Sequence, residues 1–292
     1  MKLLTKFSLL FILAAGAGLS LAGYVTHSYL LTNARDEVIR QAKLMMESAM
    51  ASRTYTTAQI VPLLEPVQTR DKVFLPQTVP AYAATESFNY LRKTYPDYTY
   101  KEATLNPTNP RDRAVDWEAD IVNNFRNNPG TKELNKERES SLGPSLFIAR
   151  PLVPTAPCLE FHDTWQRAPA AVIKRYGKDN GFGWKAGEVV GAQIVSVPMS
   201  VPIAIANRTF GTILGYMAGT FLLTLLVLNL VMVFVVARPV SRLSQVADQI
   251  SQGNLEASGA EVGGSQEICT LAASFERMRL SLVKAMRMLE DQ

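Results

Sequence analysis

Two residues in the middle of the chain have the types and spacing of a cofactor attachment site. Cys158 and His162 belong to the run Pro157-Cys158-Leu159-Glu160-Phe161-His162. A Cys-x-x-Cys-His run attaches c-type haem through thioether bonds and supplies its histidine as an axial ligand to the iron. Phe161 stands where the second cysteine would be. The run could therefore form one thioether, through Cys158, and bind iron through His162. By spacing alone this is a weak signal.

Other chemistry at the same run has less support. A zinc site needs three or four ligands, and only Cys158, His162 and carboxylates such as Glu160 and Asp163 are near in sequence. An isolated thiol at Cys158 would be a redox sensor if it were exposed and had a lowered pKa. A second axial sulfur could come from a methionine, although methionine more often fills a core; the candidates are Met45, Met46, Met50 and Met199.

The sequence has no signature of catalysis. It contains two histidines, His27 and His162, and lacks a glycine-rich loop followed by lysine, a His-Glu-x-x-His run and a Gly-x-Ser-x-Gly run. We therefore expect that the protein is not an enzyme. The net charge of +4 is spread along the chain without a dense basic block, so nucleic-acid binding is not expected either.

Two apolar runs are long enough to cross a membrane. Phe7 to Val25 and Thr212 to Val236 contain no charged residue. Basic residues flank both runs on what is then the cytoplasmic side: Lys2, Lys6, Arg238 and Arg242. We predict a two-pass protein of the cell (inner) membrane with both termini in the cytoplasm. Residues 1–25 would form the N-terminus and first span, 26–210 an extracytoplasmic domain, 211–237 the second span and 238–292 a cytoplasmic domain.

Two features of the spans have alternative interpretations. The first run could be a cleaved signal peptide, because Ser20-Leu21-Ala22 is a possible small-residue cleavage site, but its length favours retention. In the second run, Gly211, Gly215 and Gly219 lie at steps of four and would let two copies approach closely, or they reflect the tolerance of glycine in lipid. Asn229 could form a hydrogen bond across a dimer.

The pattern between the spans predicts one α+β domain. We expect helices at Asn33–Leu64, ending near Pro62 and Pro66, and at the ranges 80–93 and 114–128. We expect strands at 98–105, 146–153, 188–195 and 197–205. Helices against an antiparallel sheet in about 185 residues fit a PAS-like sensor fold best.

The chain after the second span has the repeat of a coiled coil. Its second half carries seven apolar residues at alternating steps of three and four: Ile268, Leu271, Phe275, Met278, Leu282, Ala285 and Leu289. A shorter repeat precedes it: Val240, Leu243, Ala247 and Ile250. The break between them contains Gly253-Asn254-Leu255 and a Gly/Ser-rich connector at Ser258–Ser265. Two short helices cannot bury both seams alone, so we expect a parallel homodimer.

These residues resemble the HAMP linker domain of bacterial membrane receptors. The match consists of Pro239 directly after the span, the run Ala247–Leu255, and the run from Gln266-Glu267-Ile268 through Phe275 and Met278. A bare coiled-coil stalk is the alternative, but a stalk would not need the glycine-rich break. The resemblance implies an α-helical HAMP coil at 238–292 that transmits a signal.

The middle of the chain resembles a family of extracytoplasmic, PAS-like c-type haem domains. The blocks that carry the resemblance span roughly residues 35 to 205: Glu102 to Arg111, Cys158 to His162, Ala168-Pro169, Tyr176-Gly177 and Asn180-Gly181-Phe182-Gly183-Trp184. The resemblance implies that Cys158 makes a thioether and His162 binds haem iron, in an apolar pocket that includes Phe161 and Trp184. The alternative is a pocket that has lost haem and binds another molecule.

Two neighbouring loops also have a structural and a functional interpretation. Arg111 and Arg113 in the loop 106–113 are either solvated charges or partners for a propionate or another acidic ligand. The run Asn180–Trp184 is either a turn entering a strand or part of the site.

Together these patterns predict a homodimeric membrane sensor subunit. It would relay a haem, redox or small-ligand signal through the HAMP coil to a separate cytoplasmic signalling protein, such as a kinase, because no output region follows before Gln292. A membrane-anchored c-type cytochrome for electron transfer and a haem-free small-molecule receptor are the alternatives. Cys158 and Cys269 would lie on opposite sides of the membrane, so no intrachain disulfide is expected.

Overall fold

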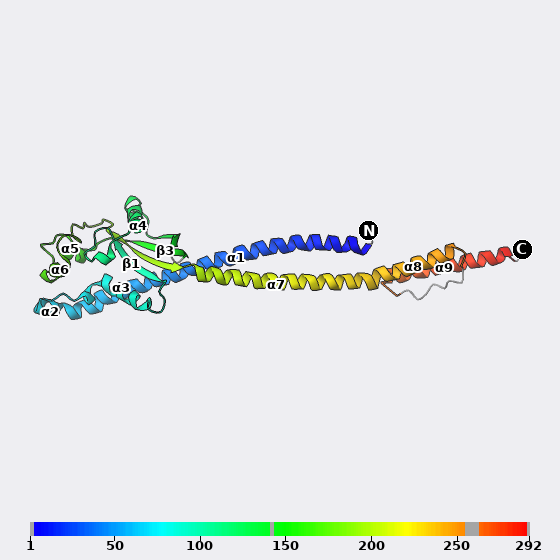
Figure 1. Ribbon diagram of the computed structural model, residues 1–292, viewed down its shortest axis with the longest axis horizontal. Coiled ribbons are helices and arrows are strands. Elements are labelled where there is room, and N and C mark those ends of the chain that lie inside the picture. Colours follow the sequence, from blue (N-terminus) through cyan, green and yellow to red (C-terminus); the bar gives the residue numbers. More distant parts are fainter. Residues whose placement is uncertain (1–2, 141–142, 255–262, 291–292) are drawn as a thin grey trace. The chain divides into compact units, whose positions relative to one another are not determined.

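The computed structural model describes residues 3–140, 143–254 and 263–290 (Figure 1). By its internal contacts the chain divides into two units. One unit is Tyr29–Arg208, and the other combines Met1–Ser28 with Thr209–Gln292. Helices α1 (Leu3–Tyr55) and α7 (Ser200–Val231) each have residues in both units. The mixture of helix and sheet confirms the predicted α+β class, whereas the PAS-like assignment stays a prediction.

The unit Tyr29–Arg208 is built on a four-stranded antiparallel sheet. Its strands are β1 (Thr99–Thr104), β2 (Leu134–Ser140), β3 (Gly143–Leu152) and β4 (Gly191–Pro198). Their order across the sheet is β1-β4-β3-β2, so β1 and β2 are the edges. β2 carries mostly charged residues, which suit an edge strand facing solvent.

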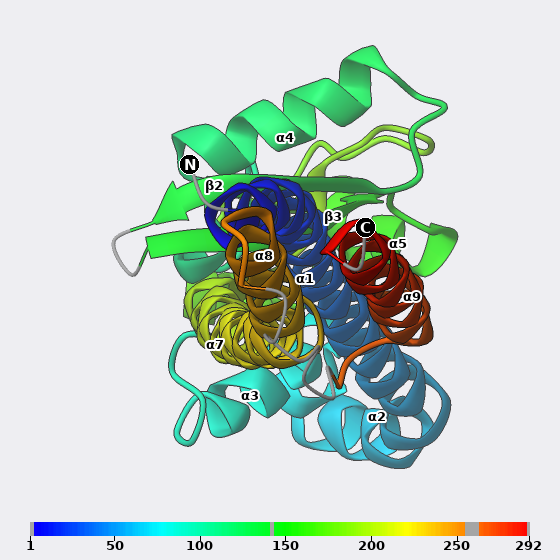
Figure 2. The same ribbon diagram turned by 90° about the vertical axis from the view of Figure 1, so that its right-hand side faces the viewer.

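Helices cover both faces of this sheet, because successive strand residues point to opposite sides. Leu146 and Ile148 of β3 pack against α1 and α3 (Pro80–Leu91). Phe147 and Ala149 pack against α4 (Asp116–Asn127). Figure 2 shows α4 on one side of the strands and α3 on the other. The helices predicted at 80–93 and 114–128 and the strands at 98–105 and 146–153 are thus confirmed.

The first long helix continues further than predicted. After Tyr55 a π-helical segment, η1 (Thr56–Ile60), leads into α2 (Val61–Asp71), which ends at Lys72 in a left-handed conformation (φ 53°). The predicted end near Pro62 and Pro66 is therefore wrong. Pro62 directly follows the π-helical segment, and Pro66 stands inside the helix.

The predicted strand at 197–205 is also wrong, because α7 begins at Ser200. The strand predicted at 188–195 exists as β4, shifted to Gly191–Pro198. A short apolar run does not distinguish strand from helix by its periodicity, and Pro202 is tolerated in the first turn of a helix. Sequence reasoning missed β2 and two short helices, α5 (Ala156–His162) and α6 (Ala170–Tyr176). It also missed two 3-10 segments, η2 (Pro76–Thr78) and η3 (Pro110–Asp112).

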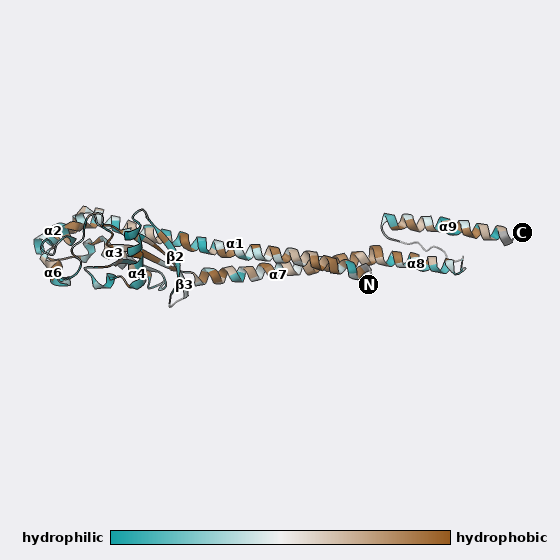
Figure 3. Ribbon diagram, turned by 90° about the horizontal axis from the view of Figure 1, so that it is seen from above, coloured by the Kyte–Doolittle hydropathy of each residue, from teal (hydrophilic) through white to brown (hydrophobic). Residues whose placement is uncertain are grey.

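Two continuous helical stretches, Leu4–Asp71 and Ser200–Ser251, are long and apolar enough to cross a membrane. Their most apolar 18-residue segments have mean hydropathies of 1.9 and 2.7, and few or none of the residues in these segments are buried. Figure 3 shows the apolar colour concentrated along α7 and the N-terminal part of α1. A two-pass arrangement is consistent with these helices; the orientation stays a prediction. Lys2, used in predicting it, lies outside the described residues.

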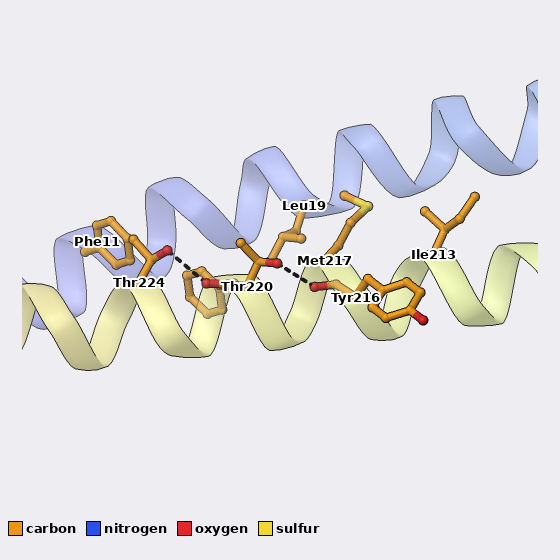
Figure 4. A pocket seen from close by; sticks show the side chains of 8 residues that line it. Phe11, Leu19, Ile213, Tyr216, Met217, Thr220 and Thr224 are labelled. Atoms are coloured by element: carbon orange, nitrogen blue, oxygen red, sulfur yellow. Dashed lines mark hydrogen bonds between the residues drawn. The ribbon is translucent and has the colours of Figure 1, made fainter.

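Within the unit of Met1–Ser28 and Thr209–Gln292, the two apolar helices contact each other. The Ser8 hydroxyl donates to Asn229 Oδ1 at 2.6 Å, and Phe11 stacks on Phe221 at 5.8 Å between ring centroids. Asn229 thus has a partner within the chain, and the hydrogen bond predicted across a dimer stays a prediction. Next to these contacts lies a shallow apolar groove of about 470 Å³ (Figure 4), lined by Phe11, Leu19, Ile213, Tyr216, Met217, Thr220, Phe221 and Thr224. Gly211, Gly215 and Gly219 have open space beside them.

The segment after α7 contains two amphipathic helices. A π-helical segment, η4 (Met232–Ala237), leads from α7 into α8 (Arg238–Ser251), and α9 (Gln266–Glu290) follows. Gly253 ends the first helix with a φ of 94°. Leu243, Ile250 and Ile268 are buried between the helices, whereas Leu271, Met278 and Leu282 are exposed. Leu255, most of the predicted connector (258–262) and the side chain of Leu289 lie outside the described part.

Candidate functional site

The short helix α5 holds both residues of the Cys-His run. Pro157 lies in its first turn, and Cys158 and His162 follow one turn apart, so their side chains are neighbours on one face. The Cys158 sulfur contacts the Thr155 hydroxyl at 3.2 Å and forms no disulfide. Phe161, in the position of the missing second cysteine, is 45% exposed.

His162 is fixed by contacts from outside its helix. Its Nδ1 lies 2.7 Å from the carbonyl oxygen of Gly181, and the Thr108 hydroxyl is 3.4 Å from the same nitrogen. The imidazole stacks on Trp184 with a centroid distance of 4.0 Å and an interplanar angle of 12°. Burial lowers the pKa of His162, against the opposing effect of the Gly181 carbonyl, so the ring is held neutral. Nδ1 then donates its proton to Gly181, and Nε2 keeps its lone pair.

Nε2 of His162 is the atom that remains available to a ligand. It has no hydrogen bond within residues 3–140, 143–254 and 263–290, and it is not sealed from solvent. A histidine that binds a metal through one nitrogen usually donates its other N–H to a carbonyl or carboxylate. The contact with Gly181 meets this requirement.

The two loops predicted near the site contact each other. The Asn106 side chain donates to the Phe182 carbonyl and accepts from the Gly181 N–H. Gly181 has a φ of 85°, and a Cβ there would lie 2.7 Å from the Thr108 backbone. This close approach brings the carbonyl of Gly181 to His162, so the glycine is required by both its conformation and its packing.

Trp184 joins the loop Asn180–Trp184 to α5. Its backbone N–H donates to the His162 carbonyl, and the Gly183 N–H donates to the Asp163 carbonyl. The indole Nε1 is buried and has no hydrogen-bond partner among the described residues. A buried N–H without an acceptor is costly, so this donor is free for a group from a ligand.

The two arginines considered as partners for an acidic ligand have protein partners. Arg111 pairs with Glu86 at 2.6 Å and with Asp112 at 3.5 Å, and Arg113 donates to the Asn180 side chain at 3.1 Å. Arg113 thereby joins the loops, which fits the structural interpretation of these charges.

A buried charged cluster that sequence reasoning missed lies between α1 and β1. Arg53 Nη1 donates to both oxygens of Glu102 at 2.5 Å, and the Tyr100 hydroxyl donates to Glu102 Oε1 at 2.7 Å. Burial raises the pKa of Tyr100, and the Glu102 carboxylate adds to this. The spacing of Arg53 in the sequence is the signal that could have indicated this cluster. Arg53 follows Ala49 by four residues, on the face of α1 that is buried at Val38, Ala42, Met46 and Ala49.

Asp112 lies near the same cluster. Burial raises its pKa to about 6, with Arg111 lowering it and Glu102 raising it further. On the opposite face of β1, Lys101 pairs with Glu118 at 2.6 Å, and Glu118 also accepts the Val115 N–H at the start of α4. The edge strand β1 therefore carries charges on both faces.

The described residues contain no group of three or more histidine, cysteine, aspartate or glutamate side chains that could hold a metal ion. Among the methionines considered as axial ligands, Met46 and Met199 are buried in the core between α1 and the sheet, and Met45 packs against that core. Their role as iron ligands stays a prediction.

The comparisons with known proteins agree with both resemblances. A family model described as Tll0287-like matches residues 31–198, more than half of the chain, and the HAMP domain model matches 232–284. The protein is thus a chain in which one such domain, between two apolar helices, precedes a HAMP domain. It belongs to the Tll0287-like family.

Among solved structures, the chain is similar to one described as the crystal structure of the cyanobacterial heme-protein Tll0287. The two share 15% identity over 56% of this chain and 95% of that chain, with a TM-score of 0.43. The comparison with curated proteins finds no match.

Proposed function

We propose that the protein is a membrane-anchored haem sensor that relays its signal through the HAMP coil. The observation that carries the proposal is the state of His162. His162 lies one turn from Cys158 in a Tll0287-like domain. Its Nδ1 donates to the Gly181 carbonyl, and its Nε2 has no hydrogen-bond partner among the described residues. These are the requirements for a histidine that binds haem iron.

The side chains around His162 fit this cofactor. Cys158 would form the single thioether, His162 would bind the iron, and Trp184 would contribute an aromatic wall behind the imidazole. A second thioether cannot form, because Phe161 stands at the position of the second cysteine. Bound haem would supply a change of redox state or a site for a gas.

The protein's own residues set the conditions for binding. The Gly181 carbonyl fixes the tautomer and the orientation of the imidazole, because Nδ1 can donate to it only when protonated. Burial keeps the ring neutral by lowering its pKa, so that Nε2 does not lose its lone pair to a proton near neutral pH. The loops joined by Asn106 hold both features in place.

The signal would pass to the cytoplasm in a homodimer. Residues 26–210 would be extracytoplasmic, and 238–292 would pair with a second copy, because Leu271, Met278 and Leu282 leave an apolar seam on α9 exposed. Packed helices switch between discrete arrangements, so a small displacement of the second span can bias the coil. The output would go to a separate cytoplasmic signalling protein, and the role is not enzymatic.

The test is an absorption spectrum of the full chain, produced with a c-type haem maturation system and purified in detergent. We expect a Soret band, and haem that remains attached after denaturation. Cys158→Ala should lose the attachment, whereas the matched control Cys269→Ala should keep it. His162→Ala should shift or abolish the Soret band, whereas His27→Ala should not.

A folded, colourless protein would contradict the haem proposal and favour the haem-free receptor. If haem is bound, the membrane-anchored cytochrome remains to be separated from the sensor. An electron carrier should transfer electrons with no change in the HAMP helices, and a sensor should change them. The exposed HAMP seam favours the sensor, since a carrier has no need for a switchable coil.

A further inference from the structure

Trp184 carries a polar atom that the described residues do not satisfy. Its indole Nε1 is buried and has no hydrogen-bond partner within residues 3–140, 143–254 and 263–290. Buried polar groups in folded proteins nearly always have a partner, because a donor that has lost water and found no acceptor is unfavourable. This donor therefore points to an acceptor that these residues do not supply.

The position of Trp184 relates this donor to the proposed iron ligand. The indole stacks on the His162 imidazole with 4.0 Å between the ring centroids and 12° between the ring planes. The Trp184 backbone N–H also donates to the His162 carbonyl at 3.1 Å, so the two residues are held together through both ring and backbone. The indole therefore lies beside any group that binds to Nε2 of His162.

The segment around these two residues is loosely packed. Between Thr155 and Gly187, Gly181 is the one buried residue, and neither α5 nor α6 contains any. Phe161 and Trp165, both large and apolar, are each 45% exposed. A segment with few buried contacts opens at low cost. A ligand can therefore reach Nε1 of Trp184, although other atoms cover it here.

The stacking also restricts which atom of the ligand can accept this hydrogen bond. A metal bound to Nε2 lies in the plane of the imidazole, so a flat macrocycle around the metal crosses that plane and has Trp184 on its His162 side. In haem the ring nitrogens are all bonded to the iron, which leaves the propionate oxygens as acceptors. A hydrogen bond to a carboxylate is charge-assisted and stronger than one between neutral groups.

We propose that Trp184 recognises an acidic group of the ligand bound at His162, to which its indole Nε1 donates. The inference rests on the proposed function, and with haem as the ligand the acidic group is a propionate. Arg111 and Arg113, the residues first considered for such a group, already bind the side chains of Glu86 and Asn180.

The first test compares two ligands that differ only in the acidic group. The full chain is produced without haem, purified in detergent and titrated with haem and with haem dimethyl ester, followed by the Soret band. We expect the wild-type protein to bind haem roughly tenfold or more tightly than the ester, the range for a hydrogen bond to a charged group. Trp184→Phe keeps an aromatic ring on the imidazole and removes the N–H. It should lose most of this preference by weakening haem binding while leaving the ester unaffected.

Two further variants control for the substitution and for the iron ligand. Trp165→Phe makes the same change at an exposed tryptophan of the same segment, so it should keep the preference for haem. His162→Ala should weaken the binding of haem and of the ester alike, because the iron is common to both and the acidic group is not.

A second measurement leaves Trp184 in place and so applies even if Trp184→Phe does not fold. The chain has three tryptophans, so isotope labelling of the indole nitrogens gives three N–H signals in a nuclear magnetic resonance spectrum. Trp117→Phe and Trp165→Phe identify two of them, and the third belongs to Trp184. Its proton should resonate further downfield with zinc protoporphyrin, a diamagnetic analogue of haem, than with zinc protoporphyrin dimethyl ester, because a hydrogen bond to a carboxylate deshields it.

The outcomes separate this inference from the proposed function. The role of Trp184 alone is overturned by a wild-type protein that binds haem and the ester equally, by a Trp184→Phe protein that keeps the full preference, or by equal positions of the Trp184 signal with the two zinc compounds. A wild-type protein that binds neither haem nor the ester overturns the proposed function, and the inference with it.

Discussion

The imidazole of His162 donates from Nδ1, and its Nε2 has no hydrogen-bond partner among the described residues. Gly181 is the residue that fixes this arrangement. Its carbonyl accepts from Nδ1 at 2.7 Å, and its backbone lies against Thr108 at a distance that excludes a side chain. The site therefore depends on a residue that has no side chain. Its signal in the sequence, the run Asn180–Trp184, indicated a turn without indicating its partner.

Gly181→Ala should destabilise the domain more than the matched control Gly187→Ala. Both glycines have positive φ values, 85° and 76°, so both substitutions cost about 1–2 kcal/mol in backbone strain. Only at position 181 would the new Cβ meet backbone, 2.7 Å from the Thr108 Cα. We expect the unfolding temperature, followed by circular dichroism, to fall by at least about 3 °C more for Gly181→Ala. Equal losses would contradict the close packing of the two loops.

Asp112→Asn should stabilise the protein at pH 7.5 and have little effect at pH 4.5. Burial raises the pKa of Asp112 to about 6, so the folded state binds the proton more tightly than the unfolded state. The stability that this group contributes is present below its ordinary pKa and is lost as the pH rises through about 6. Asparagine resembles the protonated acid.

The measurement is the unfolding temperature of both proteins at the two pH values, with Asp97→Asn as the control at an exposed position. A stabilisation at pH 7.5 that persists unchanged at pH 4.5 would show that burial of the charge is not its cause.

At the scale of elements, β1 contacts the helices on both sides of the sheet. Glu102 faces α1 and meets Arg53, whereas Lys101 faces α4 and meets Glu118. The alternating pattern of the sequence predicted that this strand exists, but it did not predict that the strand lies at an edge of the sheet. Pairing across a sheet depends on contacts far apart in sequence, which a periodic pattern does not contain.

The difference between a periodic local pattern and pairing between distant residues explains which elements were predicted and which were not. The helix at 114–128 was found because Trp117, Ile121 and Phe125 repeat at steps of four on a face that is largely buried. The strand β2, with sequence LNKERES, was missed because it is an edge strand with little apolar alternation. The predicted end of the first helix was wrong because the helix continues through Pro62 and Pro66 to Asp71, with a π-helical segment directly before Pro62.

The residues of the candidate site were also predicted where local spacing indicated them, and the buried cluster on α1 and β1 was not. Cys158 and His162 were found by their spacing, and the contact between His162 and Trp184 fits the resemblance. The buried pair of Arg53 and Glu102 was missed because the two residues lie on different elements, 49 positions apart in the sequence. A charged residue on an otherwise apolar helix stripe was the available signal.

The two spans should be coupled through Ser8 and Asn229. Their hydrogen bond of 2.6 Å joins polar side chains where the surroundings are apolar. Hydrogen bonds between membrane helices contribute about 0.5–2 kcal/mol. We expect Ser8→Ala and Asn229→Ala to be non-additive by this amount in a double-mutant cycle on thermal unfolding in detergent.

A control cycle pairs Ser20→Ala with Asn229→Ala, because the Ser20 hydroxyl bonds to Gly16 within its own helix. That cycle should be additive. Additive effects of Ser8 and Asn229 would indicate that the two residues do not interact in the membrane.

At the scale of the whole molecule, the chain combines a Tll0287-like domain, two apolar helices and a HAMP domain. The ligand site and the HAMP helices lie in different units, and α1 and α7 contribute residues to both. A signal from the site to the coil would have to involve these helices.

The exposed seam of α9 should hold a dimer together. Met278→Asp places a charge on an apolar position that is 60% exposed in the single chain. Burying an unpaired carboxylate between helices is unfavourable, so the variant should dissociate or weaken the dimer. Ala273→Asp, also exposed but away from the repeat, should not. Sedimentation of the full chain in detergent distinguishes them; equal dissociation of both variants would place the interface elsewhere.

The most direct test of the sensor function is the state of the HAMP helices with and without haem. Met278→Cys in a Cys269→Ala background gives a single thiol in the HAMP helices, whose cross-linking rate between protomers reports on the seam. We expect this rate to change when haem is bound, and the change to disappear in His162→Ala. Equal rates in the haem-free and haem-loaded proteins, with haem binding verified by the Soret band, would contradict a sensor.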